Sequence, residues 1–140
     1  MEFDTTRIVL LVEDLPPLRE TIQRYLEEAG FRVVTASDYH SAIEALKTCT
    51  PHLVCLDLTL PRESGYELCE YIRSQPLIQW IPVMVMSERA SPEDMAHAEH
   101  VGANAYLKKP FTRELLAKYV HVLLDGPNAS RPSVRRLQRP

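Results

Sequence analysis

Acidic residues directly follow two apolar runs of the chain. The run 8–12 is followed by Glu13 and Asp14, and the run 53–56 is followed by Asp57. Two carboxylates about 4 Å apart repel each other by about 4 kcal/mol at an effective dielectric constant near 20. If the fold brings these three acids together, they must take up protons or bind a cation. Their hard oxygen ligands suit Mg²⁺, with Mn²⁺ as an alternative.

A hydroxyl and an amine stand in comparable places further along the chain. Ser87 follows the apolar run 81–86, and Lys109 follows the run 104–107 after one intervening residue. A divalent cation, an ammonium group and a hydroxyl around one free carboxylate can hold a phosphoryl group. An aspartate in such a site can accept that group as a nucleophile.

Five short apolar or β-branched runs alternate with stretches of helical periodicity. The predicted strands are 7–12, 31–35, 53–56, 81–86 and 104–107, and the predicted helices are 16–29, 38–49, 65–74, 92–101 and 112–124. This alternation favours an α/β fold, in which helices cover both faces of a parallel sheet. Ligands of open parallel sheets bind beyond the carboxyl ends of the strands. Four of the five strands therefore deliver a polar residue to one edge.

Each of these polar residues taken alone has a plainer explanation. A carboxylate or hydroxyl after a strand is most often the N-cap of the next helix, and Ser87 opens the helix-leading sequence SERASPED. Capping does not account for five such residues at one edge of a sheet. We therefore expect Glu13, Asp14, Asp57, Ser87 and Lys109 to form one site.

Four stretches of the chain resemble the receiver domain of two-component response regulators. They are LVEDLPPLRETI, PHLVCLDLTLPRESGYEL, IPVMVMSERA and GANAYLKKPF, and the resemblance covers about residues 7–124. It implies a flavodoxin-like, doubly wound sheet of five parallel strands in the order 2-1-3-4-5, for which a chemotaxis receiver is a standard example. It also implies a cis peptide bond between Lys109 and Pro110, and only X–Pro bonds adopt the cis form readily.

The resemblance implies a role for each residue of the expected site. Asp57 would be the phosphoacceptor, and Ser87 and Lys109 would contact the phosphoryl oxygens. Tyr106 would be a switch residue together with Ser87, turning inward when the hydroxyl moves toward the phosphoryl group. The residues implied to hold Mg²⁺ are Glu13, Asp14, Asp57 and, through its backbone carbonyl, Thr59.

Glu88 departs from the family pattern, which usually has a small residue after the hydroxyl. A carboxylate at this place would repel a phosphoryl dianion unless it turned to solvent or paired with a cation. Arg89 and Lys108 are the candidate cations. We expect Glu88 to turn outward and to keep a modest effect on phosphorylation by small donors.

The composition of the 140-residue chain is that of one soluble globular domain. Residues 1–124 hold 12 Lys and Arg against 18 Asp and Glu, a charge that disfavours direct binding of nucleic acid. Apolar runs are too short to cross a membrane and no signal-peptide pattern is present, so we expect a cytoplasmic protein. The three cysteines form no CxxC pair and are expected to be reduced: Cys49, Cys55 and Cys69.

We expect residues 1–125 to be the receiver domain and residues 126–140 a flexible, basic, Pro-rich tail or a truncated linker. The first expectation for function is a phosphoacceptor module, with no activity beyond phosphotransfer to itself and autodephosphorylation. The implied partners are a histidine kinase or phosphotransfer protein and an unknown output protein that reads the fourth helix, fifth strand and fifth helix. We expect a stand-alone protein that is a monomer or a weak homodimer.

Three other functions stay open at this point. The chain could be the receiver part of a larger DNA-binding or enzymatic regulator, or a pseudo-receiver that binds partners without phosphorylation. The complete set of site residues argues against the pseudo-receiver, although Glu88 keeps it open. A Mg-dependent phosphatase of the haloacid dehalogenase type is more remote, because that family needs a second acid where this chain has Thr59.

Overall fold

The structure, a computed structural model, describes residues 6–126, in which strands and helices alternate without exception. The strands are β1 (Ile8–Val12), β2 (Arg32–Ala36), β3 (Leu53–Asp57), β4 (Val83–Ser87) and β5 (Ala105–Lys108). The helices are α1 (Pro16–Glu28), α2 (Tyr39–Thr48), α3 (Gly65–Ser74), α4 (Pro92–His100) and α5 (Arg113–Asp125). Every predicted element is therefore confirmed, with ends that differ by at most two residues. Apart from residue 126, the predicted tail lies outside the described residues.

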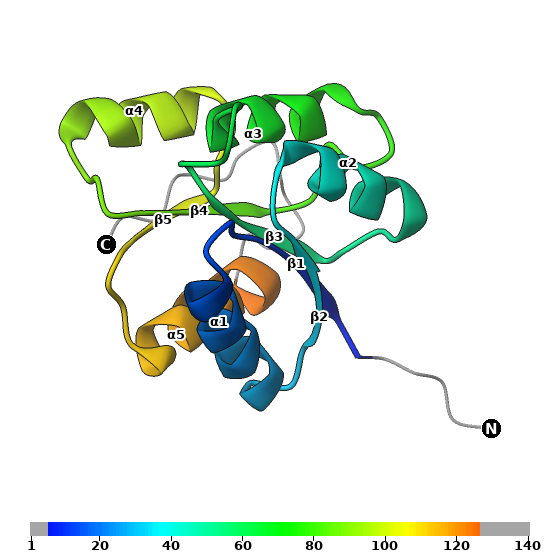
Figure 1. The fold of residues 1–140 in the computed structure, drawn as a ribbon, viewed down its shortest axis with the longest axis vertical. Helices are drawn as coiled ribbons and strands as arrows, with labels where there is room; N and C mark the ends of the chain where they lie inside the picture. The colour runs from blue at the N-terminus through cyan, green and yellow to red at the C-terminus, as the bar shows by residue number, and fades with distance from the viewer. Residues whose placement is uncertain (1–5, 127–140) are drawn as a thin grey trace.

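The five strands form a single parallel sheet in the order β2-β1-β3-β4-β5, which confirms the predicted topology. Helices α2, α3 and α4 cover one face of the sheet, and α1 and α5 cover the other (Figure 1). The chain moves outward from β1 to β2 and then returns across β1 to form β3. The strand order reverses at this point, so the carboxyl ends of β1 and β3 lie next to each other.

Packing on both faces fixes the positions of the strand ends. Strands β3 and β4 are buried along their whole length, and four of the five residues of β1 are buried. Side chains alternate between two cores, so Leu10 packs on the side of α2 and α3 while Leu11 packs on the side of α1 and α5. Burial of one such side chain contributes about 1.5–3 kcal/mol. The ends of these strands are therefore held firmly in place.

Strand β4 begins at Val83, two residues later than the sequence pattern indicates. Pro82 has no N–H group to donate to a neighbouring strand, although its carbonyl accepts a hydrogen bond of 3.0 Å from the N–H of Val54. The strand then runs one residue further than predicted and includes Ser87.

Side-chain caps begin four of the five helices. The capping residues are Asp38, Ser64, Ser91 and Thr112. Helix α1 instead begins with Pro16 after Leu15, whose side chain makes no capping hydrogen bond. None of the acids of the expected site is used to cap a helix, and the cap of α4 is Ser91 rather than Ser87. Within residues 6–126, no helix combines the length and the apolar character needed to cross a bilayer.

Candidate functional site

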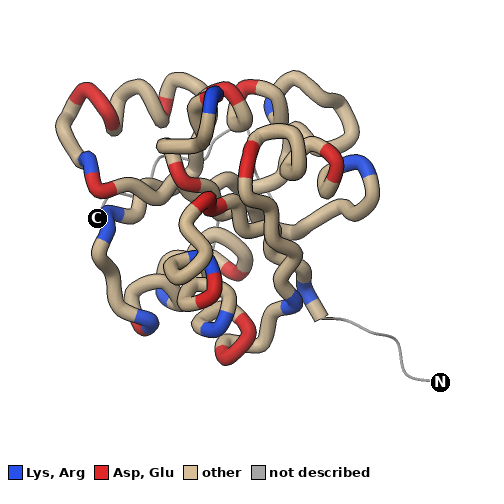
Figure 2. Tube along the Cα trace, viewed as in Figure 1, with Lys and Arg blue, Asp and Glu red and all other residues tan. Residues whose placement is uncertain are grey.

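Strands β1, β3 and β5 bring charged side chains together at the carboxyl edge of the sheet. Val12 is level with Leu56 in the register of β1 and β3, so the next residues, Glu13 and Asp57, are neighbours. The Nζ atom of Lys109 donates to Glu13 Oε1 at 2.7 Å and to Asp57 Oδ2 at 3.1 Å. All three of these side chains are buried. Figure 2 shows acidic segments close together where β1 and β3 end.

Asp14 adds a third carboxylate to this group. One ligand oxygen from each of Glu13, Asp14 and Asp57 lies within 4.8 Å of the others. Hard oxygen ligands at this density match the donor set that Mg²⁺ prefers, with Mn²⁺ as a second possibility. Lys109 offers a single positive charge to the three acids, so the group keeps an excess of negative charge that a divalent cation would offset.

Burial controls the protonation of this cluster. Removal of Glu13 from water raises its pKa to about 7, and the nearby charge of Asp57 acts in the same direction, against the hydrogen bond from Lys109. Burial alone would lower the pKa of Lys109, but its hydrogen bond to Glu13 and the charge of Asp57 outweigh that effect and raise it. Lys109 therefore keeps its proton, and burial makes the carboxyl of Glu13 easier to protonate than an exposed glutamate.

The backbone around Asp57 holds its side chain in a defined place. Oδ1 of Asp57 accepts a hydrogen bond of 3.0 Å from the N–H of Thr59. Helix α3 begins close above the strand, and a Cβ atom on Gly65 would lie 2.4 Å from the carbonyl oxygen of Asp57. A glycine is therefore required at position 65 if α3 is to begin this near to the acid.

The segment between β4 and α4 joins Ser87 to the buried Tyr106. Oγ of Ser87 accepts a hydrogen bond of 3.0 Å from the N–H of Arg89. The hydroxyl of Tyr106 donates to the carbonyl oxygen of the same Arg89, and the ring of Tyr106 is fully buried. The guanidinium of Arg89 pairs with Asp94 in α4 at 2.8 Å. Tyr106 thus lies in the inward position, bonded to the segment that carries Ser87.

A hollow of about 360 Å³ opens over the cluster of acids. Its lining includes Asp14, Asp57, Thr59, Ser87, Glu88 and Lys109. The structure therefore brings the predicted site residues to one place, with Glu13 buried beneath them and Tyr106 joined to them through Arg89. The expected cis bond between Lys109 and Pro110 is present.

Comparison with known proteins decides the family. A sequence model described as the response regulator receiver domain matches residues 9–121. This chain belongs to the response regulator receiver family. The receiver domain is a signalling module of two-component systems, and members of the family bind Mg²⁺ at an acidic pocket of the kind described above.

Curated relatives of this receiver domain include several transcriptional regulators. The chain is 36% identical over 118 residues to the phosphate regulon transcriptional regulatory protein PhoB of Escherichia coli, covering 84% of the chain and 52% of PhoB. It is 37% identical over 113 residues to the transcriptional regulatory protein GltR of Pseudomonas aeruginosa, covering 80% of the chain and 47% of GltR. The chain thus spans about half the length of the curated relatives that it matches.

Solved structures of receiver domains share the fold of this chain. The chemotaxis response regulator CheY4 of Vibrio cholerae superposes with a TM-score of 0.82 at 29% identity, covering 86% of this chain and all of CheY4. The signal receiver domain of a histidine kinase from Syntrophus aciditrophicus gives a TM-score of 0.80 at 30% identity, covering 87% of this chain and 92% of that one.

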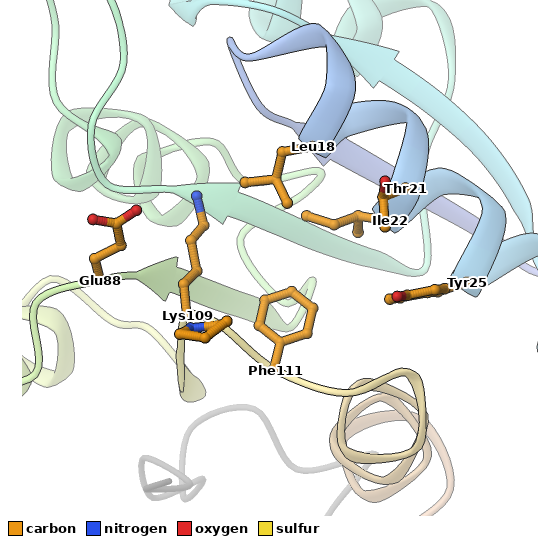
Figure 3. A pocket seen from close by; sticks show the side chains of 8 residues that line it. Leu18, Thr21, Ile22, Tyr25, Glu88, Lys109 and Phe111 are labelled. Atoms are coloured by element: carbon orange, nitrogen blue, oxygen red, sulfur yellow. The ribbon is translucent and has the colours of Figure 1, made fainter.

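The structure also contains features that the sequence pattern did not indicate. Of the two candidate cations for Glu88, Arg89 is engaged elsewhere, because its guanidinium binds Asp94. Glu88 itself is exposed, as expected. A second hollow, of about 370 Å³, lies between α1 and the segment after β5, and its lining includes Ile22 and Phe111 (Figure 3).

Proposed function

We propose that this receiver domain accepts a phosphoryl group on Asp57 from a histidine kinase or a phosphotransfer protein. The observation that carries the proposal is the contact of Lys109 with both Glu13 and Asp57, beside the third carboxylate of Asp14. Capping does not explain these acids, since α1 and α3 begin without them. An oxygen of Asp57 attacks phosphorus, the bond from phosphorus to the donor nitrogen breaks, and its electron pair stays on the imidazole, which takes up a proton.

The surrounding residues stabilise the transferred group. Lys109 and the hydroxyl of Ser87 bind phosphoryl oxygens, which accept hydrogen bonds and carry negative charge. The residues that would hold Mg²⁺ are Glu13, Asp14, Asp57 and the backbone carbonyl of Thr59. Bound Mg²⁺ supplies positive charge against the phosphoryl oxygens during transfer. We assign the protein no enzymatic activity beyond this transfer and autodephosphorylation.

Phosphorylation changes the face formed by α4, β5 and α5. The phosphoryl group draws Ser87 away from the N–H of Arg89, and Tyr106 is bonded to the carbonyl of the same residue. A movement of this segment therefore alters both the setting of Tyr106 and the start of α4, where Arg89 binds Asp94. An output protein that contacts this face would distinguish the two states.

The same domain also fits a second arrangement, as the receiver part of a transcriptional regulator. The observation that favours it is that PhoB and GltR are named as transcriptional regulatory proteins and are about twice the length of the matching region. These relatives give no support to the expectation that the protein stands alone. A kinase and an output partner, acting in the cytoplasm, are common to both arrangements.

Acetyl phosphate with Mg²⁺ tests the proposed function. Intact mass measurement should show the addition of one phosphoryl group, and chelation of the metal should prevent it. Asp57→Asn should abolish the addition, while Asp125→Asn, at the far end of the domain, should label as the wild type does. Equal labelling of the Asp57→Asn protein would show that another residue is the acceptor.

A further inference from the structure

Glu88 lies where the two hollows described above meet. It lines the hollow over the acid cluster, and it also lines the second hollow between α1 and the segment after β5. Figure 3 shows the side chain of Lys109 standing between Glu88 and the apolar side chains of Leu18 and Phe111. Any donor that covers the second hollow while it presents a phosphoryl group to Asp57 therefore passes close to Glu88.

The charge of Glu88 has no counter-ion in the part of the chain that the structure describes. Arg89 is turned to Asp94, at 2.8 Å, and no ion pair joins Lys108 to Glu88. Lys109 is bonded to Glu13 and Asp57, so its ammonium group already serves two carboxylates. Glu88 therefore adds an uncompensated negative charge at the entrance to a site that already has an excess of acids.

Such a charge acts on different donors in opposite directions. A small dianionic donor is repelled on its approach, because it brings only negative charge. A donor that carries a cation beside its phosphoryl group is attracted, because the cation can pair with Glu88 while the phosphoryl group faces Lys109. Charges of this kind at the edge of an interface govern the selection of partners and the rate of association.

We propose that Glu88 makes this domain selective for donors that carry a positive charge next to the phosphoryl group, such as a phosphohistidine flanked by lysine or arginine. The proposal rests on the proposed function and names the chemistry of the donor that the site prefers. Glu88 does not contact the reacting atoms and acts as a determinant of specificity.

Two phosphohistidine peptides provide the test. They share one sequence and one phosphorylated histidine, but the residues beside the histidine are lysines in the first peptide and glutamines in the second. The initial rate of phosphorylation of Asp57 is followed by intact mass with the 140-residue chain in saturating Mg²⁺. Acetyl phosphate is the third donor, and Glu70→Gln, an exposed residue of α3, is the matched control for the loss of one acidic charge.

The wild type should react about tenfold faster with the lysine peptide than with the glutamine peptide at low ionic strength, and salt should reduce that ratio. Glu88→Gln should lower the ratio to about threefold or less and should raise the rate with acetyl phosphate several-fold. Glu70→Gln should keep the wild-type ratio. An unchanged ratio in Glu88→Gln, or no preference in the wild type, would overturn this inference alone. Failure of all three donors to label Asp57 would overturn the proposed function and the inference together.

Discussion

The two ends of the sheet use charge in opposite ways. At the carboxyl edge, three carboxylates share one ammonium group, that of Lys109. At the amino edge, Arg7 before β1 forms a bidentate ion pair with Asp125 at the end of α5, with N–O distances of 2.7 and 3.1 Å. The carboxyl edge therefore keeps an excess of negative charge, whereas this pair at the amino edge is matched.

Arg73 extends the contrast at the amino edge. Its half-buried guanidinium donates to the carbonyl oxygens of Gly102, Gln79 and Ile81 and to Oδ1 of Asn104, at 2.6–2.9 Å. These hydrogen bonds tie the end of α3 to the segments that precede β4 and β5. Polar groups that have hydrogen-bond or ion-pair partners thus stabilise the amino end of the fold. The free energy that they contribute offsets the mutual repulsion of the acids at the carboxyl end.

Replacement of Arg73 should give the largest effect on stability. Arg73→Met keeps much of the apolar stem but removes the donor to the part-buried carbonyl groups of Gly102 and Ile81, which should lower the free energy of unfolding by about 3 kcal/mol. Urea denaturation followed by circular dichroism measures the change. Arg24→Met serves as the control, because the ion pair of Arg24 with Glu28, at 3.9 Å, is exposed. Similar losses for the two variants would contradict the importance of the hydrogen bonds of Arg73.

Asp14→Asn should have the opposite effect and stabilise the folded protein. Loss of one carboxylate from a group whose oxygens lie within 4.8 Å of each other should raise the free energy of unfolding by about 1 kcal/mol in metal-free buffer, once solvent screening is counted. Addition of Mg²⁺ should reduce or reverse the gain, since Asp14 is a proposed ligand. Thermal melts with and without Mg²⁺ test this, and a less stable variant in metal-free buffer would contradict the assumed repulsion.

An Asp→Asn substitution at the amino edge, Asp125→Asn, should destabilise the protein mildly. The size of this effect should depend on pH. The hydrogen bond from Arg7 is the main cause that holds the pKa of Asp125 at about 2, below its ordinary value of 3.8. A lowered pKa in the folded state stabilises the protein above the ordinary value, and this stabilisation is lost as pH falls toward 2. Asp125→Asn should therefore lower stability by about 1 kcal/mol or less at pH 7. Chemical denaturation between pH 7 and pH 2 should show the two proteins converging, and a difference that stays constant would rule out this pair as its origin.

The smallest expected effect belongs to Arg62, in the loop after β3. Its φ angle of 69° lies in the left-handed region that side chains other than glycine rarely adopt. Arg62→Gly should raise the free energy of unfolding by about 0.5 kcal/mol, because relief of strain is partly offset by the greater freedom of glycine in the unfolded chain. Arg62→Ala keeps the backbone strain and should bring no such gain in the same thermal melts. An equal gain from both variants would point to the charge of Arg62 instead.

The sequence predicted the parts of this structure that depend on regular patterns. Apolar runs and helical periodicity placed the elements, and the parallel sheet brought Glu13, Asp57 and Lys109 to one edge. The residue types already pointed to a divalent cation and a phosphoryl group, but the individual role of each residue came from the resemblance to receiver domains, and these roles are proposals.

The remaining features depend on contacts between distant side chains. Arg73 reads as an ordinary basic residue near a helix end, and only the tertiary structure encloses it among carbonyl groups. Arg89 pairs with Asp94 and not with Glu88, and this pairing likewise depends on how the segment before α4 folds back. No spacing rule in the sequence predicts these contacts, because each depends on residues that only the folded structure brings close.

The bond between Lys109 and Glu13 has a consequence for the order in which the domain forms. It joins residues 96 positions apart, and the pair of Arg7 and Asp125 joins residues 118 positions apart. Contacts of such long separation are slow to form, because a long loop must close before they contribute. During synthesis on the ribosome, Glu13 emerges long before the amine that neutralises it. The acid cluster therefore reaches its final state only after β5 has joined the sheet, so under the proposed function an unfinished chain has no competent site to expose to a donor.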